Sequence, residues 1–257
     1  MDPARAAGMH CLFSLPQPIP KKNDVLKPFW YQIYFWDINP ADNLGRDGHP
    51  KLGEFIPNLG LPRRMWAGGK ISFLNDIILG VSAKKISTIE KVDKKMGKSG
   101  PLAFVTEKIE IRQKDTLCVR EYKNLVYREE YEKGKESTTS ITSNKIADQE
   151  ERIRFTTTDL YRYSGLTFNG HRIHYDRDYS KNVEGYAGLV VHGPLLAQYL
   201  IHFAMKSIGQ ISEFEFRGVS PLFDYEDAII CKKNTDTGIE LWIKNSDNKL
   251  CMTAFAK

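Results

Sequence analysis

The apolar segment GPLLAQYLIHFA, residues 193–204, restricts the fold more than any other part of the chain. Gly193 and Pro194 favour a helix that begins here, because proline suits the first helical turn. Large apolar side chains then cover most of the helix circumference, namely Leu195, Leu196, Tyr199, Leu200 and Phe203. Other structure must enclose a helix of this kind. The sequence therefore predicts a buried helix with a sheet wrapped around it.

The two halves of the chain look like weak copies of one plan. KISFLNDIILG in the first half and SEFEFRGVSPLF in the second align at a constant offset of 143 residues, which matches Ile71 with Phe214. Each segment opens with the apolar–polar alternation of a strand. Each also follows an apolar segment, 28–36 in the first half and 193–204 in the second. We therefore predict a sheet around a helix, made twice; chance similarity of short apolar segments is the alternative.

A polar stretch, residues 131–152, separates the two copies. It contains almost no large apolar residue and is predicted to be a linker or a mobile loop. The predicted organisation is a first unit at 1–135, a linker at 136–152 and a second unit at 153–257. Further strand patterns lie at 84–92, 102–113, 116–129, 213–220, 228–233, 239–245 and 250–256.

Composition restricts the class of protein. The hydrophobic content of 41% and the charged content of 27% are typical of soluble globular domains. No apolar stretch is long enough to span a membrane. The start, MDPARAAGMH, lacks the pattern of a signal peptide, so we expect a cytoplasmic protein. The four cysteines have no metal-ligand spacing, which predicts reduced thiols and no metal site: Cys11, Cys118, Cys231 and Cys251.

The net charge of +5 leaves several partners open. Lysines gather in AKKISTIEKVDKKMGKSG and could meet nucleic acid, meet a phosphorylated cofactor, or form only a solvated face. No motif of a nucleic-acid-binding domain supports the first reading. The motifs GxSxG, GxGxxG and GxxxxGK[ST] are also absent from the sequence, so serine hydrolysis, hydride transfer and phosphoryl transfer lack their usual support.

The stretch FNGHRIHYD, residues 168–176, gathers groups that can transfer or hold protons. Histidine is the best proton carrier near neutral pH, which favours His174 as a base. Asn169 can converge with it if the chain turns between them, and Asp176 would share its face in an extended segment. The free N–H groups near Gly193 suit an oxyanion. These parts can add water to a double bond conjugated to a thioester. Purely structural roles are the alternative, and they are preferred for His171 and His192; His10, His49 and His202 are treated as background.

The segment YRYSGLTFNGHRIHYDRDYSKNVEGYAGLVVHGPLLAQYL resembles the hydroxyacyl-thioester dehydratase type 2 group of MaoC-like hydratases, in particular bacterial mesaconyl-C4-CoA and itaconyl-CoA hydratases. The resemblance covers nearly the whole chain and includes DPARAA, GRDGHPKLGEFIPNLGLPRRMWAGG, KSGPLAFVT, NLVYRE and VSPLFD. It implies an α+β double hotdog fold, with two units that each place a curved antiparallel sheet around a central helix. It also implies reversible hydration of an enoyl-CoA thioester by a hydro-lyase. Coenzyme A is then part of the substrate, with no metal or redox cofactor.

The MaoC-like pattern G-D-x-N-P-[IL]-H-x-D implies roles for single residues. Its histidine falls on His174 and its last aspartate on Asp176, while its first, catalytic aspartate falls on Asn169. An amide cannot take a proton. Either His174 is the only base and Asn169 holds water, or another carboxylate, with Asp176 nearest in sequence, replaces the missing one. The oxyanion glycine of the family maps onto Gly193.

A dicarboxylic acyl group, as in the conversion of itaconyl-CoA or mesaconyl-C4-CoA to citramalyl-CoA, would require a fixed cation. Arg172 is the first choice and Arg63 and Arg64 come next, with inter-unit salt bridges as their alternative role; His192 is placed beside the substrate. Other functions remain open: dehydration of plain (3R)-hydroxyacyl thioesters, thioester hydrolysis, or a non-catalytic module that binds acyl-CoA or nucleic acid. The expected partner is acyl-CoA, without nucleic acid or membrane, and a sheet edge could form a homodimer.

Overall fold

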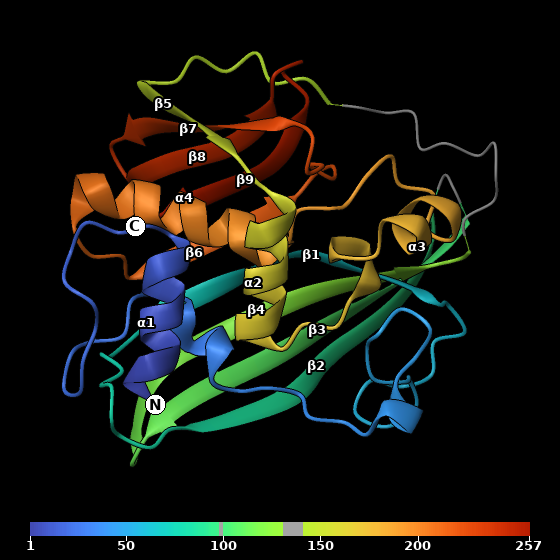
Figure 1. Ribbon diagram of the computed structural model, residues 1–257, viewed down its shortest axis with the longest axis horizontal. Coiled ribbons are helices and arrows are strands. Elements are labelled where there is room, and N and C mark those ends of the chain that lie inside the picture. Colours follow the sequence, from blue (N-terminus) through green and yellow to red (C-terminus); the bar gives the residue numbers. More distant parts are fainter. Residues whose placement is uncertain (98–99, 131–140) are drawn as a thin grey trace.

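The computed structural model describes residues 1–97, 100–130 and 141–257, and these form one antiparallel sheet of nine strands with helices on one of its faces (Figure 1). The strands lie in the order β2-β3-β4-β1-β6-β9-β8-β7-β5. Their bounds are β1 Arg63–Phe73, β2 Lys84–Gly97, β3 Gly100–Gln113, β4 Thr116–Arg128, β5 Gln149–Arg154, β6 Glu213–Gly218, β7 Asp227–Thr235, β8 Gly238–Asn245 and β9 Leu250–Ala256.

The sheet confirms the predicted duplication. Strands β2-β3-β4-β1 of the first half are repeated in reverse order as β6-β9-β8-β7 in the second half. Strands β1 and β6 pair antiparallel at the junction, and there Ile71 lies opposite Phe214. The offset of 143 matches the same two residues, so a local twofold axis between β1 and β6 relates the two copies. All the strand patterns read from the sequence form strands.

The helix α4 (Gly193–Ile208) is the predicted enclosed helix. Its buried residues surround the axis: Leu195, Leu196, Ala197, Gln198, Leu200, Ile201, Phe203 and Ala204. The helix α2 (Thr157–Thr167) begins at a capping box, in which Thr156 and Asp159 each accept a hydrogen bond from the other's backbone N–H. The other helical elements are α1 (Pro3–Leu12), α3 (Arg177–Asn182), and the 3₁₀ turns η1 (Trp30–Ile33), η2 (Ala41–Asn43) and η3 (Arg172–His174).

The first half differs from the second in what its sheet surrounds. The apolar segment 28–36 forms only the single turn η1, whereas α4 has 16 residues. Trp30, Tyr31 and Ile33 are still buried, so the segment fills part of the expected core position. The short turn leaves space beside β3 and β4, and this space becomes part of the cavity described below.

Residues 136–140 of the predicted linker lie outside the described part of the chain. Beyond them, Thr142 forms a bridge with Lys249, and β5 pairs with β7 in the sheet of the second half. The unit boundaries stay a prediction.

The lysine-rich segment forms β2 at one edge of the sheet, where most of its side chains are exposed. Positive charge at an edge strand discourages pairing with another sheet. The four cysteines are free thiols, as predicted. No helix within the described residues is long and apolar enough to cross a membrane.

Candidate active site

His174 is buried at the end of the turn η3, and its tautomer is fixed by one hydrogen bond. Its Nδ1 lies 2.7 Å from the carbonyl oxygen of Val190. A carbonyl can only accept, so Nδ1 carries the proton and Nε2 keeps its lone pair. Burial lowers the pKa of His174 to about 4. The ring is therefore neutral near pH 7, with Nε2 able to accept a proton.

His192 supports this ring from behind. The two imidazoles stack with centroids 3.6 Å apart and an interplanar angle of 19°. His192 is fully buried, and its Nε2 lies 2.8 Å from the Ser164 hydroxyl on α2. It is not among the described residues that line the cavity, so the structure places it behind His174 instead of beside a substrate.

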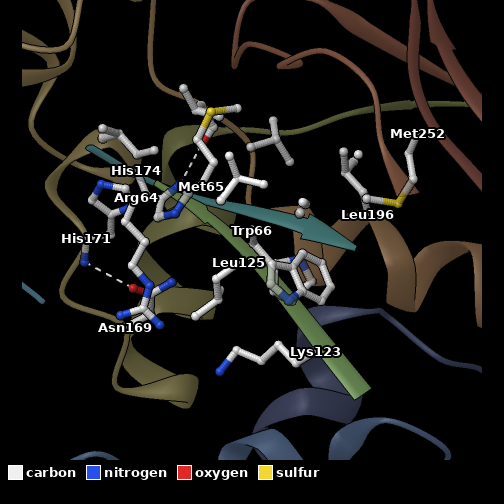
Figure 2. A pocket seen from close by; sticks show the side chains of 18 of the residues that line it. Arg64, Met65, Trp66, Lys123, Leu125, Asn169, His171, His174, Leu196 and Met252 are labelled. Atoms are coloured by element: carbon white, nitrogen blue, oxygen red, sulfur yellow. Dashed lines mark hydrogen bonds between the residues drawn. The ribbon is translucent and has the colours of Figure 1, made fainter. Parts of the chain in front are cut away.

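A cavity of about 550 Å³ joins the two halves of the chain and is lined by some of the predicted active-site residues. His174, Asn169 and Gly193 all line it, so three predicted residues border the same cavity. Figure 2 shows His174 and Asn169 there. Strands β1, β3 and β4 and the turn η1 supply most of the wall from the first half. A cavity of this size accommodates a small acyl group and part of a carrier.

Asn169 is one of the residues that line this cavity. Its Oδ1 accepts a hydrogen bond of 3.0 Å from the backbone N–H of His171, which folds the chain back on itself (Figure 2). The amide NH₂ remains as a donor, which suits the holding of a water oxygen. Asn169 and His174 converge because the segment turns between them, as the sequence predicted.

Gly193 opens α4 at the cavity wall, followed by Pro194. The first N–H groups of a helix have no partner within the helix, and proline has none to give, so the Gly193 N–H is the first donor. A Cβ on Gly193 would lie 2.6 Å from the Trp66 ring. Glycine is therefore required by close packing against this indole.

Asp176 and Arg172 do not take the catalytic and substrate-binding roles predicted for them. Arg172 binds the Asp176 carboxylate at 2.7 Å, and Asp176 also caps α3 by accepting from the Tyr179 N–H. These contacts lower the pKa of Asp176. Neither side chain is among the described residues that line the cavity. The prediction assumed an extended segment, but the 3₁₀ turn η3 aims Asp176 away from His174.

The two arginines of LPRRMW have different surroundings. Arg63 is buried and forms an ion pair of 2.7 Å with Glu184, which links β1 to the second half. Arg63 thus has the salt-bridging role that was the alternative to substrate binding. It is not among the described residues that line the cavity. Arg64 lines the cavity, and no ion pair involves it in the described part of the chain. Figure 2 shows Arg64 among the side chains that line the cavity.

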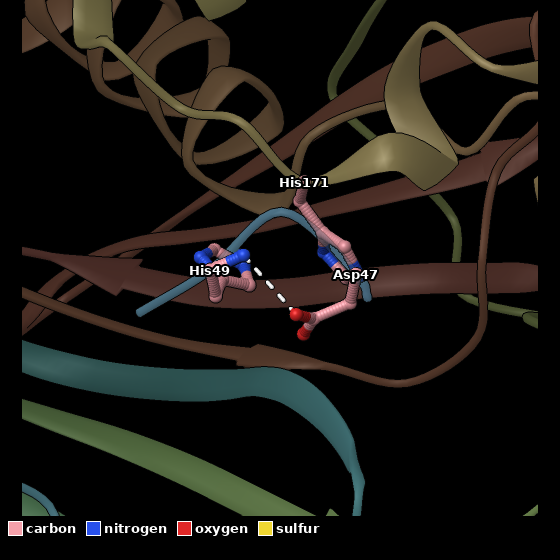
Figure 3. Close-up of side chains that lie close together, drawn as sticks. All are labelled: Asp47, His49 and His171. Carbon is pink, nitrogen blue, oxygen red and sulfur yellow. Dashed lines mark hydrogen bonds between the residues drawn. The ribbon is translucent and has the colours of Figure 1, made fainter. Parts of the chain in front are cut away.

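A loop of the first half brings two further groups that the sequence interpretation missed. Asp47 and His49 lie beside His171, and the ligand atoms of the three residues are within 4.8 Å of one another (Figure 3). The loop fits closely because a Cβ on Gly48 would lie only 2.0 Å from the Gly170 carbonyl oxygen. His49 was treated as background, yet it lines the cavity. The two histidines are far apart in sequence, so only the motif GRDGHP could have drawn attention to it.

The cluster of Asp47, His49 and His171 has the residue types of a metal site, and both of its histidines have lowered pKa values. Burial lowers the pKa of His171 to about 2, and the positive charge of Arg64 acts in the same direction. The same two causes lower the pKa of His49. Burial, the larger cause, keeps both imidazoles in the neutral form, in which each ring offers one N–H donor and one lone pair. The Arg64 guanidinium lies in the same cavity wall.

Comparison with known proteins finds the same family that the sequence resembles. The family model of hydroxyacyl-thioester dehydratase type 2 matches residues 30–224. A mesaconyl-C(4)-CoA hydratase from Chloroflexus aurantiacus is 36% identical over 256 residues, which cover 98% of this chain and 90% of the relative.

Solved structures agree at the level of the fold. A MaoC-like dehydratase from Phytophthora capsici superimposes with a TM-score of 0.73 at 11% identity, covering 100% of this chain and 92% of that one. A Mycobacterium tuberculosis protein described as a double hotdog fold gives a TM-score of 0.57 at 10% identity, covering 99% and 87%. The predicted α+β double hotdog is confirmed.

Proposed function

Because this chain belongs to the hydroxyacyl-thioester dehydratase type 2 family and is a hydro-lyase of CoA thioesters, we propose that it hydrates a short dicarboxylic enoyl-CoA, such as mesaconyl-C4-CoA or itaconyl-CoA. The reaction is reversible, and coenzyme A enters as part of the substrate. The absence of a metal or redox cofactor, a cytoplasmic location and a homodimer remain predictions.

The proposed mechanism uses one base and two hydrogen-bond donors. A water molecule donates to Nε2 of His174 and accepts from the Asn169 amide. In an ester whose double bond is conjugated to the thioester, such as mesaconyl-C4-CoA, His174 takes its proton as the water oxygen bonds to the β-carbon, and the electrons of the double bond move toward the thioester carbonyl. The Gly193 N–H stabilises the negative charge that develops there. The His174 imidazolium then returns the proton to the α-carbon, so one water is added and the ring is restored.

The observation that carries this proposal is the contact between His174 Nδ1 and the Val190 carbonyl. It leaves Nε2 unprotonated, on a ring that lines the same cavity as the Gly193 N–H. Burial keeps His174 neutral, and the stacked His192 ring limits its rotation. A base with a fixed lone pair and an oxyanion donor thus share one enclosed space.

Arg64 supports the dicarboxylic assignment. A guanidinium in a cavity wall, without an ion pair in the described part of the chain, is available to bind an anionic ligand group. His49 and His171 lie within its electrostatic reach and are neutral, so each can donate one N–H without adding charge. A free carboxylate would accept the two parallel hydrogen bonds that a guanidinium offers.

A panel of CoA esters tests this function. Mesaconyl-C4-CoA, itaconyl-CoA and crotonyl-CoA are each incubated with the protein, and mass spectrometry follows the gain of one water. A thiol reagent run in parallel detects free CoA, which a thioesterase would release. Water gain without thiol release is expected. Thiol release without hydration, or no turnover of any ester, would contradict the proposal.

Arg64→Met tests the acyl group separately. Loss of a hydrogen-bonded charge should lower kcat/KM for the dicarboxylic esters by roughly tenfold to a hundredfold. Crotonyl-CoA has no second carboxylate, so its kcat/KM should change far less. Equal losses on both kinds of ester would show that Arg64 does not recognise the carboxylate.

A further inference from the structure

A buried polar pair at the first-half end of the cavity has no role in the reaction described above. The Tyr31 hydroxyl donates a hydrogen bond of 2.6 Å to Glu121 Oε2. Tyr31 is 3% exposed and Glu121 is 1% exposed, yet both line the cavity. Gln32 and Tyr163 line the same region and are joined by a hydrogen bond of 3.2 Å from the tyrosine hydroxyl. The end of the cavity is therefore polar, although it lies inside the protein.

Two polar atoms in this part of the wall are enclosed and unpaired. Glu121 Oε1 and Trp66 Nε1 have no hydrogen-bond partner within the described residues. Leaving a buried polar atom unpaired is unfavourable, and such atoms are rare in native structures. Both atoms are enclosed themselves, but they belong to residues that line the cavity. This wall therefore holds polar atoms that the described part of the chain leaves without a partner.

The fold itself does not require this carboxyl group. Ile71 on β1 lies opposite Glu121 on β4, and its equivalent Phe214 on β6 lies opposite Ala256 on β9. Ala256 is therefore the counterpart of Glu121, and it is buried and apolar. The duplicated sheet is satisfied by an alanine here. Glu121 also faces the space that the short turn η1 leaves open, which has no parallel around α4.

The ligand group must suit a carboxyl group in either protonation state. Burial raises the pKa of Glu121, which favours the neutral acid. A neutral acid offers an O–H donor and a carboxylate offers an acceptor. A hydroxyl group can satisfy both, because it donates and accepts. A second carboxylate would meet a group of the same kind, whereas Arg64, which also lines the cavity, offers a carboxylate a guanidinium.

We propose that Glu121 and Tyr31 form a second subsite, which binds a hydroxyl group on the acyl chain at a distance from the thioester. The proposal rests on the proposed function in that the cavity is taken to hold the acyl group of a CoA ester. Substrates would then include hydroxylated acyl chains, beside the short dicarboxylic ones.

Binding of saturated acyl-CoA esters tests the subsite without any turnover. Calorimetry gives the Kd of each ester from butyryl-CoA to octanoyl-CoA, and of the same ester with a terminal hydroxyl. At one chain length the hydroxylated ester should bind roughly tenfold more tightly than the plain one. In Glu121→Leu this ratio should fall to about one. Glu121→Gln retains a donor and an acceptor and should keep part of the preference, and Tyr31→Phe should reduce it.

Glu90→Leu is the matched control, because Glu90 is an exposed carboxylate on β2. Its ratio should equal that of the unaltered protein. Equal binding of both esters at every chain length would overturn the subsite, and so would a preference that survives in Glu121→Leu. If that variant does not fold, Glu121→Gln and Tyr31→Phe decide by the same ratio. Hydration of enoyl-CoA esters is measured separately, so failure of the hydratase proposal would be recognised independently.

Discussion

Replacing Gly193 by alanine should remove most of the activity while leaving the fold in place. The new Cβ would lie 2.6 Å from Cε3 of Trp66 and 3.1 Å from its Cζ3, whereas ordinary contacts begin at 3.4 Å. The closer contact is thus 0.8 Å too short. Trp66 cannot easily yield, because Phe29 stacks on it with centroids 6.3 Å apart and Phe216 packs against it at 4.6 Å.

The start of α4 must therefore move, and the oxyanion donor moves with it. A shift of about 1 Å in an active-site group can cost about 10² in rate, and loss of an oxyanion donor about 10²–10³. We expect kcat to fall by about 10²–10³. Overpacking should also lower the free energy of unfolding by about 1–3 kcal/mol.

The assay is kcat for hydration of the best enoyl-CoA ester, with thermal unfolding measured on the same samples. Gly165→Ala is the matched control, since Gly165 lies within α2 and a Cβ there meets no atom within 4 Å. This variant should keep its rate. Trp66→Leu, alone and combined with Gly193→Ala, tests the clash: the double variant should recover part of the rate lost on adding the methyl group. A rate for Gly193→Ala within a fewfold of the unaltered protein would refute the assignment of Gly193 as the oxyanion donor.

Three further predictions concern the titration of the buried histidines and the role of the Asp176 carboxylate. Because the pKa of His174 is lowered to about 4, kcat/KM at pH 5.5 should nearly equal that at pH 7.5; a base with the ordinary value of 6.5 would lose roughly tenfold, and such a loss would contradict the burial argument. The fold lowers the pKa of five histidines below 6.5: His49, His171, His174, His192 and His202. Below pH 6.5 the unfolded chain therefore binds more protons than the folded chain. The free energy of unfolding should drop by up to about 1.4 kcal/mol per histidine and pH unit until the folded-state pKa values are reached, and Tm should fall with it. A flat Tm between pH 6.5 and pH 5 would contradict this. Asp176→Asn should keep kcat within a fewfold while lowering Tm slightly, since the carboxylate caps α3. A loss of kcat as large as that caused by removing a general base would show that Asp176 is a catalytic residue.

The enclosed helix and the strands could be predicted because their signals are local. The apolar surface of α4 is visible in twelve consecutive residues, and strand alternation repeats every second residue. The offset that matches Ile71 with Phe214 gave the duplication, and the sheet places these two residues opposite each other. The same reasoning could not show that the first half would wrap a single turn, because 28–36 is as apolar as 193–204.

The active site was only partly predictable, and the failures have physical causes. His174, Asn169 and Gly193 belong to one continuous segment of the second half, and the sequence predicted both the turn before His174 and the helix start at Gly193. The position of Asp176 depended on whether three residues formed a strand or a 3₁₀ turn, and spacing alone cannot decide this. Glu121 comes from the other half of the chain, so its contribution depends on tertiary packing, for which the sequence carries no local signal.

The rate of His174→Ala tests the central claim most directly. If Nε2 of His174 is the base, removal of the ring should lower kcat by at least about 10²–10⁴ on mesaconyl-C4-CoA or itaconyl-CoA, with circular dichroism unchanged. A folded His174→Ala variant that hydrates these esters at nearly the original rate would contradict the assignment of the base and the mechanism built on it.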